Sequence, residues 1–340
     1  MTAATLAAPA PARAGTLPPA LLTVGIDVGG TKTSCVVTDS DDQLMLHEVE
    51  ATMADSLPDQ LVALVQRAVD RMASEARGTI AAVGVAVPGR VEPLSGTIAL
   101  AVNLGGQDLA LGPLLERAVG LPCFVEHDAR AAASWVNDGG QGDDLAYLAV
   151  GTGISAGIVL NGRVLRGANG LAGEVGHVTA DPDGHACACG SRGCLEVVAA
   201  GPHIARMARE AVVSGRPTRL AADATAADVF AAAAGGDALA QELVATVAAH
   251  LARAIRGLVL TLGVSHVVIG GGVAAAGDAL MKPVLAAIDR ERAASPLVEA
   301  AFKEARVELL SPQVEAGARG AAAIARQRVS ARQREGVGDR

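Results

Sequence analysis

Four potential zinc ligands lie close together between residues 177 and 194. His177 is followed by Cys187, Cys189 and Cys194, and glycines between the cysteines allow the chain to turn sharply. Zn²⁺ is usually held tetrahedrally by Cys and His, and a Cys₃His set leaves no coordination position open. Three free thiols in a loop are the alternative, but three of the five cysteines fall in this short segment. The spacing therefore predicts a structural zinc site.

Two carboxylates flank this zinc loop. Glu174 lies just before His177, and Glu196 lies just after Cys194. A metal that ties the loop together would hold both side chains on fixed backbone. Rigidly held carboxylates suit a polyhydroxylated substrate, so the pattern indicates a polar pocket.

Three glycine-rich turns each follow an apolar segment that is typical of a buried strand. They are Asp27-Val28-Gly29-Gly30-Thr31-Lys32, Gly151-Thr152-Gly153 and Gly270-Gly271-Gly272. Backbone N–H groups in such turns can bind phosphate. Thr31 and Lys32 add a hydroxyl and a cation, and Asp27 could hold Mg²⁺ directly or through water. Each turn alone could be an ordinary loop, but three at strand ends favour a nucleotide site, the third turn approaching the base and ribose.

Asp128 follows an expected strand at 122–126 and precedes an expected helix, where ligand chemistry is common in α/β proteins. A carboxylate there can accept a proton from a hydroxyl that attacks phosphorus. A helix N-cap is the alternative role. His127 could contact the ligand or be a buried structural histidine, and Asn103 could bind sugar hydroxyls or make a turn.

These residues are carried by an alternation of strands and helices, which predicts the α/β class. Strands are expected at 22–28, 33–38, 44–51, 81–87, 122–126, 145–150, 155–160, 163–165 and 265–269. Helices are expected at 56–76, 111–119, 129–137, 202–214, 225–234, 236–261 and 314–327. Ser56 is the expected N-cap of the first helix, with Pro58 in its first turn. The strand–turn–strand pattern occurs twice, near 22–38 and 145–165, which indicates a coarse duplication.

The composition narrows the class of protein. A chain of 340 residues with 51% apolar and 1% aromatic residues predicts two domains or lobes packed with small aliphatic side chains. The formal net charge of −8 argues against nucleic-acid binding. No apolar run reaches membrane-spanning length with suitable flanks, and the cysteines do not form a disulfide framework, so a cytoplasmic location is expected. Residues 1–21 are expected to be a disordered extension, and 328–340 a flexible tail.

Taken together, these motifs resemble the ROK family (repressor, open reading frame, kinase), particularly its bacterial glucokinases. The likeness runs from about Leu22 to Arg326. It rests on the first glycine turn, Pro88-Gly89, Gly96, Asn103-Leu104, Glu126-x-Asp128-Ala129, Gly151-Thr152-Gly153, Gly173-Glu174-Val175-Gly176-His177, the cysteine run at 187–196, and Gly270–Gly272.

The resemblance implies an actin-like/ribonuclease-H-like ATPase fold with two α/β lobes and a cleft between them. The small lobe would span 22–125 and include the closing helix near 314–327. The large lobe would span 126–313 and hold the zinc loop. The resemblance also implies a homodimer, which is common in the family.

The resemblance also implies roles for the residues. Asp128 would be the catalytic base for the sugar 6-hydroxyl. Asn103, Glu174, His177 and Glu196 would hold the other hydroxyls, His177 using one ring nitrogen for zinc and the other for sugar. Asp27 to Lys32 and Gly151 to Gly153 would hold ATP and Mg²⁺ for in-line transfer of the γ-phosphoryl group.

One motif departs from the family pattern. Family glucokinases usually read Glu-Asn-Asp-Ala-Asn, whereas this chain reads Glu126-His127-Asp128-Ala129-Arg130. The replaced Asn contacts a sugar hydroxyl near C3, so His127 raises the prospect of an amino-sugar substrate, such as 3-amino-3-deoxyglucose or an N-acetylated hexosamine, beside glucose. A non-catalytic sugar-sensing regulator is a further alternative, but only about 21 residues precede the first strand, too few for a helix-turn-helix domain. Polyphosphate is an alternative donor to ATP.

Overall fold

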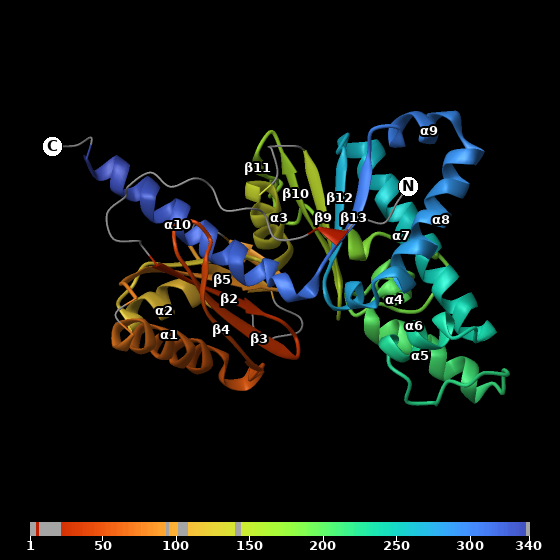
Figure 1. Ribbon diagram of the computed structural model, residues 1–340, viewed down its shortest axis with the longest axis horizontal. Helices are drawn as coiled ribbons and strands as arrows, with labels where there is room; N and C mark the ends of the chain where they lie inside the picture. Colours follow the sequence, from red (N-terminus) through yellow and green to blue (C-terminus); the bar gives the residue numbers. More distant parts are fainter. Residues whose placement is uncertain are drawn as a thin grey trace. The chain divides into compact units, whose positions relative to one another are not determined.

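The computed structural model describes residues 5–6, 22–75, 77–92, 95–100, 108–139 and 144–337 (Figure 1). Contacts divide the chain into two compact units, each of which is described by itself. Unit 1 comprises Met1–Ala8, Gly142–Leu165 and Ala172–Val314; unit 2 comprises Pro9–Gln141, Arg166–Leu171 and Glu315–Arg340.

Unit 2 is built on a five-stranded sheet with the strand order β4-β3-β2-β5-β8. The strands are β2 (Leu22–Val28), β3 (Lys32–Thr38), β4 (Leu44–Ala51), β5 (Ile80–Val87) and β8 (Cys123–His127). Strands β2, β5 and β8 are parallel, and β3 and β4 join them as antiparallel hairpins. Strands β6 (Arg90–Glu92) and β7 (Thr97–Leu100) form a separate small antiparallel hairpin, which follows β5 in the sequence. The predicted strands of this half are confirmed.

Helices α1 (Leu57–Ser74) and α2 (Leu111–Val119) bury their apolar faces in one core with this sheet. The apolar spacing of α1 and its early proline are as predicted. Ser56 is the N-cap residue of α1, as predicted, but its side chain makes no capping hydrogen bond. The side chain of Gln60, in the first turn of α1, instead contacts the chain before the helix. Its Oε1 accepts a hydrogen bond from Met53 N, and its Nε2 donates to Ala51 O.

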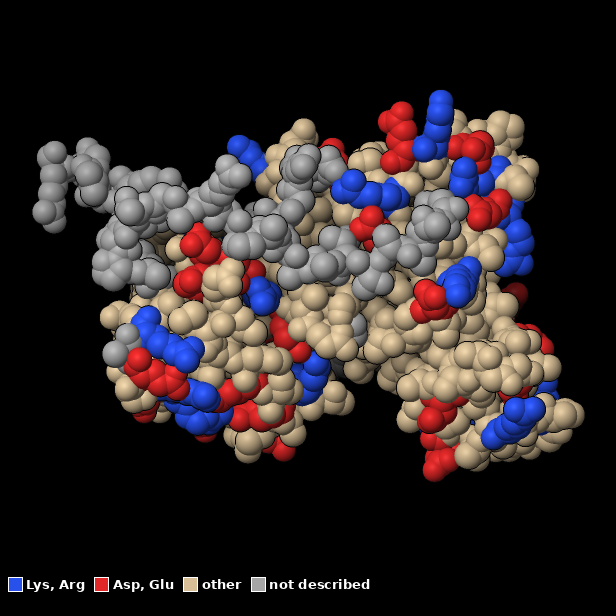
Figure 2. Space-filling model, in the orientation of Figure 1, with Lys and Arg blue, Asp and Glu red and all other residues tan. Residues whose placement is uncertain are grey.

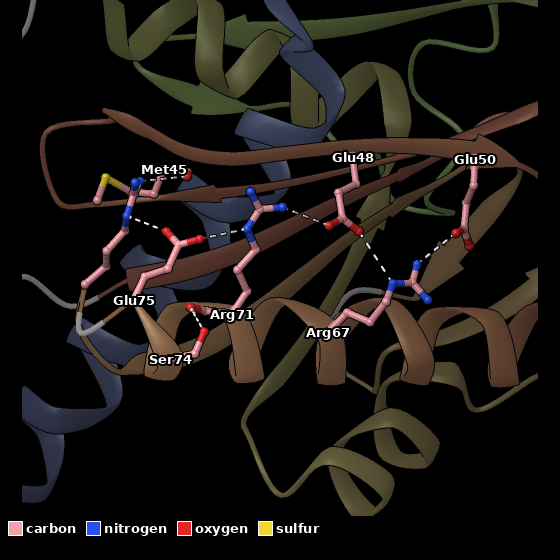
Figure 3. A network of polar contacts seen from close by, with 8 residues as sticks. Met45, Glu48, Glu50, Arg67, Arg71, Ser74 and Glu75 are labelled. Carbon is pink, nitrogen blue, oxygen red and sulfur yellow. Dashed lines mark hydrogen bonds and ion pairs between the residues drawn. The ribbon is translucent and has the colours of Figure 1, made fainter.

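A row of ion pairs also fixes α1 to the edge strand β4 (Figure 3). Arg67 lies 2.8 Å from Glu50 and 3.5 Å from Glu48, and Arg71 lies 3.6 Å from Glu48. These groups are half-exposed, and such pairs contribute little free energy each. Their charges nevertheless cover an edge strand whose backbone could otherwise pair with another chain.

The opposite face of the sheet is covered by α3 (Asp128–Gly139) and α10 (Ala316–Val337), which contact each other (Figure 1). Gly25 of β2 and Gly84 of β5 allow a close approach, because a methyl group on either would overlap a carbonyl oxygen of α10, at Ala318 and Ala321 respectively. Small residues on both surfaces thus explain how so few aromatic residues fill this core.

The turn between β3 and β4 is tied to both of these helices. Asp42 Oδ2 accepts hydrogen bonds from Trp135 Nε1 of α3 at 2.8 Å and from Arg319 Nη1 of α10 at 2.6 Å. Helix α3 therefore belongs to unit 2, whereas the sequence assigned residues from 126 onward to the larger lobe.

Unit 1 is built on a second sheet, with the order β1-β13-β12-β9-β10-β11. The strands are β1 (Thr5–Leu6), β9 (Leu145–Val150), β10 (Ile154–Leu160), β11 (Arg163–Val164), β12 (His266–Gly270) and β13 (Arg306–Leu310). Its helices are α4 (Glu196–Ala199), α5 (Gly201–Val213), α6 (Ala226–Ala234), α7 (Ala238–Leu262), α8 (Asp278–Ala294) and α9 (Pro296–Phe302). One apolar core joins the strands and the helices, in which Ala, Val and Leu predominate.

Several elements of unit 1 and one helix end differ from the expectation. The sequence did not predict α8, α9, β13 or β1, and α10 continues past residue 327 to Val337. Thr5–Leu6 lie within the expected disordered extension but pair in parallel with Leu309 and Leu310. The rest of that extension lies outside the described residues.

Helix α7 is the one described helix that is long and apolar enough to cross a membrane by length and composition. Its buried residues, among them Leu243, Val247, Leu251 and Ile255, belong to the core of unit 1, as expected of the central helix of a packed domain. On the face drawn in Figure 2, acidic and basic side chains alternate over the described residues, without a continuous basic surface.

Candidate functional site

The predicted zinc ligands meet in unit 1. One ligand atom from each of His177, Cys187, Cys189 and Cys194 lies within 4.8 Å of the others. Cys187 Sγ is 3.7 Å from His177 Nδ1, and Cys189 Sγ is 3.7 Å from Cys194 Sγ. A tetrahedron with Zn–S bonds of about 2.3 Å has ligand separations of about 3.8 Å. The donor set and its spacing therefore fit a zinc ion, with His177 Nδ1 as the ring nitrogen in the cluster.

Backbone packing on β10 places the residues just before this cluster. A methyl group on Gly173 would overlap Ala156 O, and one on Gly176 would overlap Ile154 O. Ala156 N also donates to Gly173 O at 2.7 Å. The backbone at Gly173 and Gly176 therefore lies so close to β10 that no side chain fits there, and this close approach holds Glu174 and His177 beside β10.

Glu196 lies against the second glycine turn. Its Oε2 accepts a hydrogen bond from Ile154 N at 3.0 Å, and a methyl group on Gly153 would lie 2.5 Å from the same oxygen. Glu196 also begins helix α4, two residues after the predicted zinc ligand Cys194. One carboxylate thus joins the zinc loop to a predicted phosphate-binding turn.

The second and third glycine turns lie together in unit 1. A methyl group on Gly151 would be 3.6 Å from Gly272 N, and one on Gly271, where φ is 85°, would lie 2.6 Å from Val150 O. Gly201 N, at the start of α5, donates to Gly151 O at 2.8 Å. The structure therefore brings two of the three predicted turns into one site.

The first glycine turn is in unit 2, between β2 and β3. Gly29 N donates to Lys32 O at 2.9 Å and closes the turn. Thr52, directly after β4, donates through Oγ1 to Gly29 O at 2.7 Å and through N to Thr31 O at 3.1 Å. Thr52 was missed in the sequence, because nothing local marks a threonine that contacts a turn twenty residues earlier.

Asp27 is half-buried at the carboxyl end of β2, facing the start of α10, where a methyl group on Gly317 would overlap its carboxylate. Burial, and then the nearby Asp128 and Glu315 carboxylates, raise the pKa of Asp27 to about 7, although Lys32 opposes the shift. A divalent cation would offset this concentration of negative charge, which suits Asp27 to the predicted Mg²⁺ site.

Asp128 follows β8 directly and begins α3. The parallel register pairs Asp27 with Ala86, and Ala86 with Glu126, so Asp27 and Asp128 lie at the same end of the sheet. Asp128 Oδ1 accepts a hydrogen bond from Ala129 N at 2.6 Å and lies 3.1 Å from His127 Nδ1. Oδ2 has no partner in the described part of the chain and remains available to a ligand.

His127 is a buried residue, with 6% of its side chain exposed. The 3.1 Å separation of its Nδ1 from Asp128 Oδ1 is within ion-pair distance, but its geometry is not that of a hydrogen bond. Its predicted neighbour in the sugar site, Asn103, lies outside the described residues. Unit 2 therefore carries Asp27, the first glycine turn and Asp128, and unit 1 carries the remaining predicted ligands that the structure describes.

Comparisons with known proteins agree with this arrangement. The model of the ROK family matches residues 23–328. A glucokinase of Halalkalibacterium halodurans is 38% identical over 275 residues, 77% of this chain and 83% of the relative. An N-acetylmannosamine kinase of Citrobacter koseri is 36% identical over 256 residues, 74% of this chain and 83% of that protein.

Among solved structures, a ROK family glucokinase from Streptomyces griseus in complex with glucose and AMPPNP aligns with 90% of this chain and 99% of its own. Its TM-score is 0.75 and its sequence identity is 29%. The match confirms the expected actin-like α/β fold.

Proposed function

The chain belongs to the ROK family of sugar kinases, and we propose that it transfers the γ-phosphoryl group of ATP to the 6-hydroxyl of glucose or a close analogue of glucose. The observation that carries the proposal is the position of Asp128. This carboxylate directly follows a parallel strand, at the same end of the sheet as the first glycine turn, and one of its oxygens is available. A base within reach of phosphate ligands is what a sugar kinase needs.

In the proposed reaction, the sugar O6 attacks the γ-phosphorus of ATP while the bond from that phosphorus to the β,γ-bridging oxygen breaks, and ADP leaves. Asp128 Oδ2 accepts the proton of the 6-hydroxyl. The glycine turns at 29–32 and 151–153 bind the phosphates through backbone N–H groups, and Lys32 adds a positive charge. Mg²⁺ bound near Asp27 would neutralise charge on the phosphates.

The zinc cluster has a positioning role in this proposal. Zinc on His177 Nδ1 would fix the imidazole ring and leave Nε2 to contact a sugar hydroxyl. Glu174 and Glu196 would accept hydrogen bonds from other hydroxyls. Support comes from the backbone on either side of Glu174, which packs on β10 at Gly173 and Gly176, and from the hydrogen bond between Ile154 N of β10 and the Glu196 carboxylate.

An amino-hexose is the second candidate substrate. His127 replaces an Asn of the family pattern, and a neutral imidazole offers one ring nitrogen that can accept a hydrogen bond from an ammonium group. The similarity to N-acetylmannosamine kinases also keeps N-acetylated hexosamines in view. Among amino sugars, 3-amino-3-deoxyglucose tests the His127 argument most sharply.

The test is a comparison of kcat/KM for glucose, N-acetylmannosamine and 3-amino-3-deoxyglucose, in wild type and His127→Asn, with ATP and with polyphosphate. Preference for glucose in both proteins supports a glucokinase in which His127 does not set the choice. A preference for an amino sugar that His127→Asn reverses supports the second candidate. If no hexose is phosphorylated, a sugar-sensing regulator is favoured instead. We further propose that the protein is cytoplasmic and forms a homodimer. Light scattering after gel filtration would test the homodimer.

A further inference from the structure

Glu126 is a buried carboxylate that the reaction proposed above does not use. Only 2% of its side chain is exposed, and four N–H groups donate to it. Oε1 accepts from His127 N at 3.0 Å and Arg130 Nε at 2.9 Å. Oε2 accepts from Arg166 Nε at 3.0 Å and Arg166 Nη2 at 2.6 Å.

The two arginines come from different segments of the chain. Arg130 lies in α3, two residues after Asp128, and is as deeply buried as Glu126. Arg166 belongs to the segment Arg166–Leu171. This segment is part of unit 2, although the residues before and after it in the sequence belong to unit 1. Arg130 Nη1 also donates to Gly170 O of that segment at 2.9 Å. The segment is therefore held at both of its ends.

Electrostatics favour the charged form of this cluster. Burial alone would raise the pKa of Glu126, but Arg166, Arg130 and the hydrogen bond from His127 N outweigh it and hold the pKa below its usual range. Arg130 Nη2 is nevertheless buried and has no hydrogen-bond partner among the described residues. Apolar side chains of similar volume would stabilise a core at least as well, so stability alone explains the cluster poorly.

The position of the cluster supplies a better explanation. On one side, the backbone N–H of His127 fixes the residue that precedes the base Asp128. On the other side, the held segment ends at Leu171, shortly before Gly173, which is fixed on β10, and Glu174 follows. Fixing 166–171 limits the backbone freedom of the chain that enters the sugar ligand Glu174.

We propose that Glu126, Arg130 and Arg166 are positioning residues that coordinate the placement of the base Asp128 with that of segment 166–171, and thereby set the affinity for the sugar. This inference rests on the proposed kinase function. Sequence patterns could not indicate this cluster, since Arg130 was notable only as a departure from the family pattern, and Arg166 lies forty residues from Glu126.

The test uses the full-length protein and variants that leave the proposed ligands intact. Arg166→Met removes the two bonds to Glu126 Oε2, and Arg163→Met is the control, because Arg163 is an exposed arginine of the preceding hairpin strand. We expect Arg166→Met to raise the KM for the sugar about tenfold or more, and to leave the KM for ATP nearly unchanged. Arg163→Met should change neither.

Two further measurements separate positioning from general destabilisation. Amide hydrogen exchange without substrates should be faster at 166–171 in Arg166→Met than in wild type, with the strands of the sheet unchanged. The double variant Glu126→Gln/Arg166→Met should raise the sugar KM by less than the product of the single effects, since both substitutions break the same contact. The double-variant comparison applies when Glu126→Gln folds, and the half-exposed Arg166 provides a single variant that should fold and that decides the proposal without it.

A sugar KM within twofold of wild type in Arg166→Met would overturn the proposal, even if exchange at 166–171 became faster. Equal rises in the KM for sugar and for ATP would also overturn it. A wild-type protein that phosphorylates no hexose would contradict the proposed function instead. In that event the exchange measurement still decides whether Glu126 holds the segment.

Discussion

Thr52 holds the first glycine turn closed by donating from Oγ1 to the carbonyl oxygen of Gly29 at 2.7 Å, while Thr52 N donates to Thr31 O. Thr33 Oγ1 lies 3.0 Å from the same hydroxyl. A single side chain directly after β4 thus contacts both the start of the turn, at Gly29, and the strand that follows it, at Thr33.

Replacing Thr52 with Val keeps the shape of the side chain and removes its hydrogen bonds. We expect the KM for ATP to rise about three- to tenfold, since a hydrogen bond of this kind contributes about 1 kcal/mol. The KM for the sugar should stay the same. Thr246→Val is the control, because its hydroxyl bonds only to Glu242 O within α7. An unchanged KM for ATP in steady-state kinetics would show that Thr52 does not shape the turn.

Loss of one thiol should remove the metal. Cys189 is the exposed cysteine of the cluster, so Cys189→Ser disturbs packing little. Elemental analysis should find about one zinc per chain in wild type and much less in Cys189→Ser. The KM for the sugar should rise at least tenfold, because metal ligands orient their neighbours. Cys35→Ala, which changes a cysteine away from the cluster, should keep its zinc. Full sugar affinity in metal-free protein would contradict the positioning role.

The raised pKa of Asp27 predicts a pH dependence of stability. The folded protein holds this proton up to about pH 7, whereas an unfolded chain releases it near 3.8. Between these values the folded state binds more protons, so the contribution of Asp27 to the free energy of unfolding falls as pH rises. Urea unfolding without metal or nucleotide should show Asp27→Asn gaining stability relative to wild type from pH 5 to 8, by at most about 1.4 kcal/mol per pH unit. A constant difference would mean that Asp27 is already charged at pH 5.

Local pattern predicted most of the elements that carry the site. Apolar runs that end in glycine turns identified β2, β9 and β12, and the spacing of the cysteines identified the metal ligands. These signals are short-range, since each depends on residues close together in the chain. Helix α8 escaped the same reasoning because Pro283 interrupts its pattern. Strand β13 does carry a strand signal, since Arg306 and Glu308 alternate with buried residues, but the prediction missed it.

Contacts between distant residues could not be predicted in this way. The bond from Arg130 to Gly170 joins residues forty positions apart, and Thr52 reaches a turn from another strand. Nor could the sequence reveal that the Glu196 carboxylate lies against Gly153. Residue types thus predicted the chemistry of the site, whereas the side chains that support it follow from tertiary packing.

The central claim is that Asp128 is the base in phosphoryl transfer to a sugar, and the most direct measurement compares sugar phosphate formation by wild type and Asp128→Asn. The substitution keeps the size of the side chain but removes its ability to take a proton. With ATP and a saturating hexose, we expect wild type to form hexose 6-phosphate and ADP in equal amounts, and Asp128→Asn to turn over about 10²–10⁴-fold more slowly while still binding the sugar. Asp41→Asn, an exposed carboxylate, should match wild type. Turnover by Asp128→Asn within a few-fold of wild type would contradict the account.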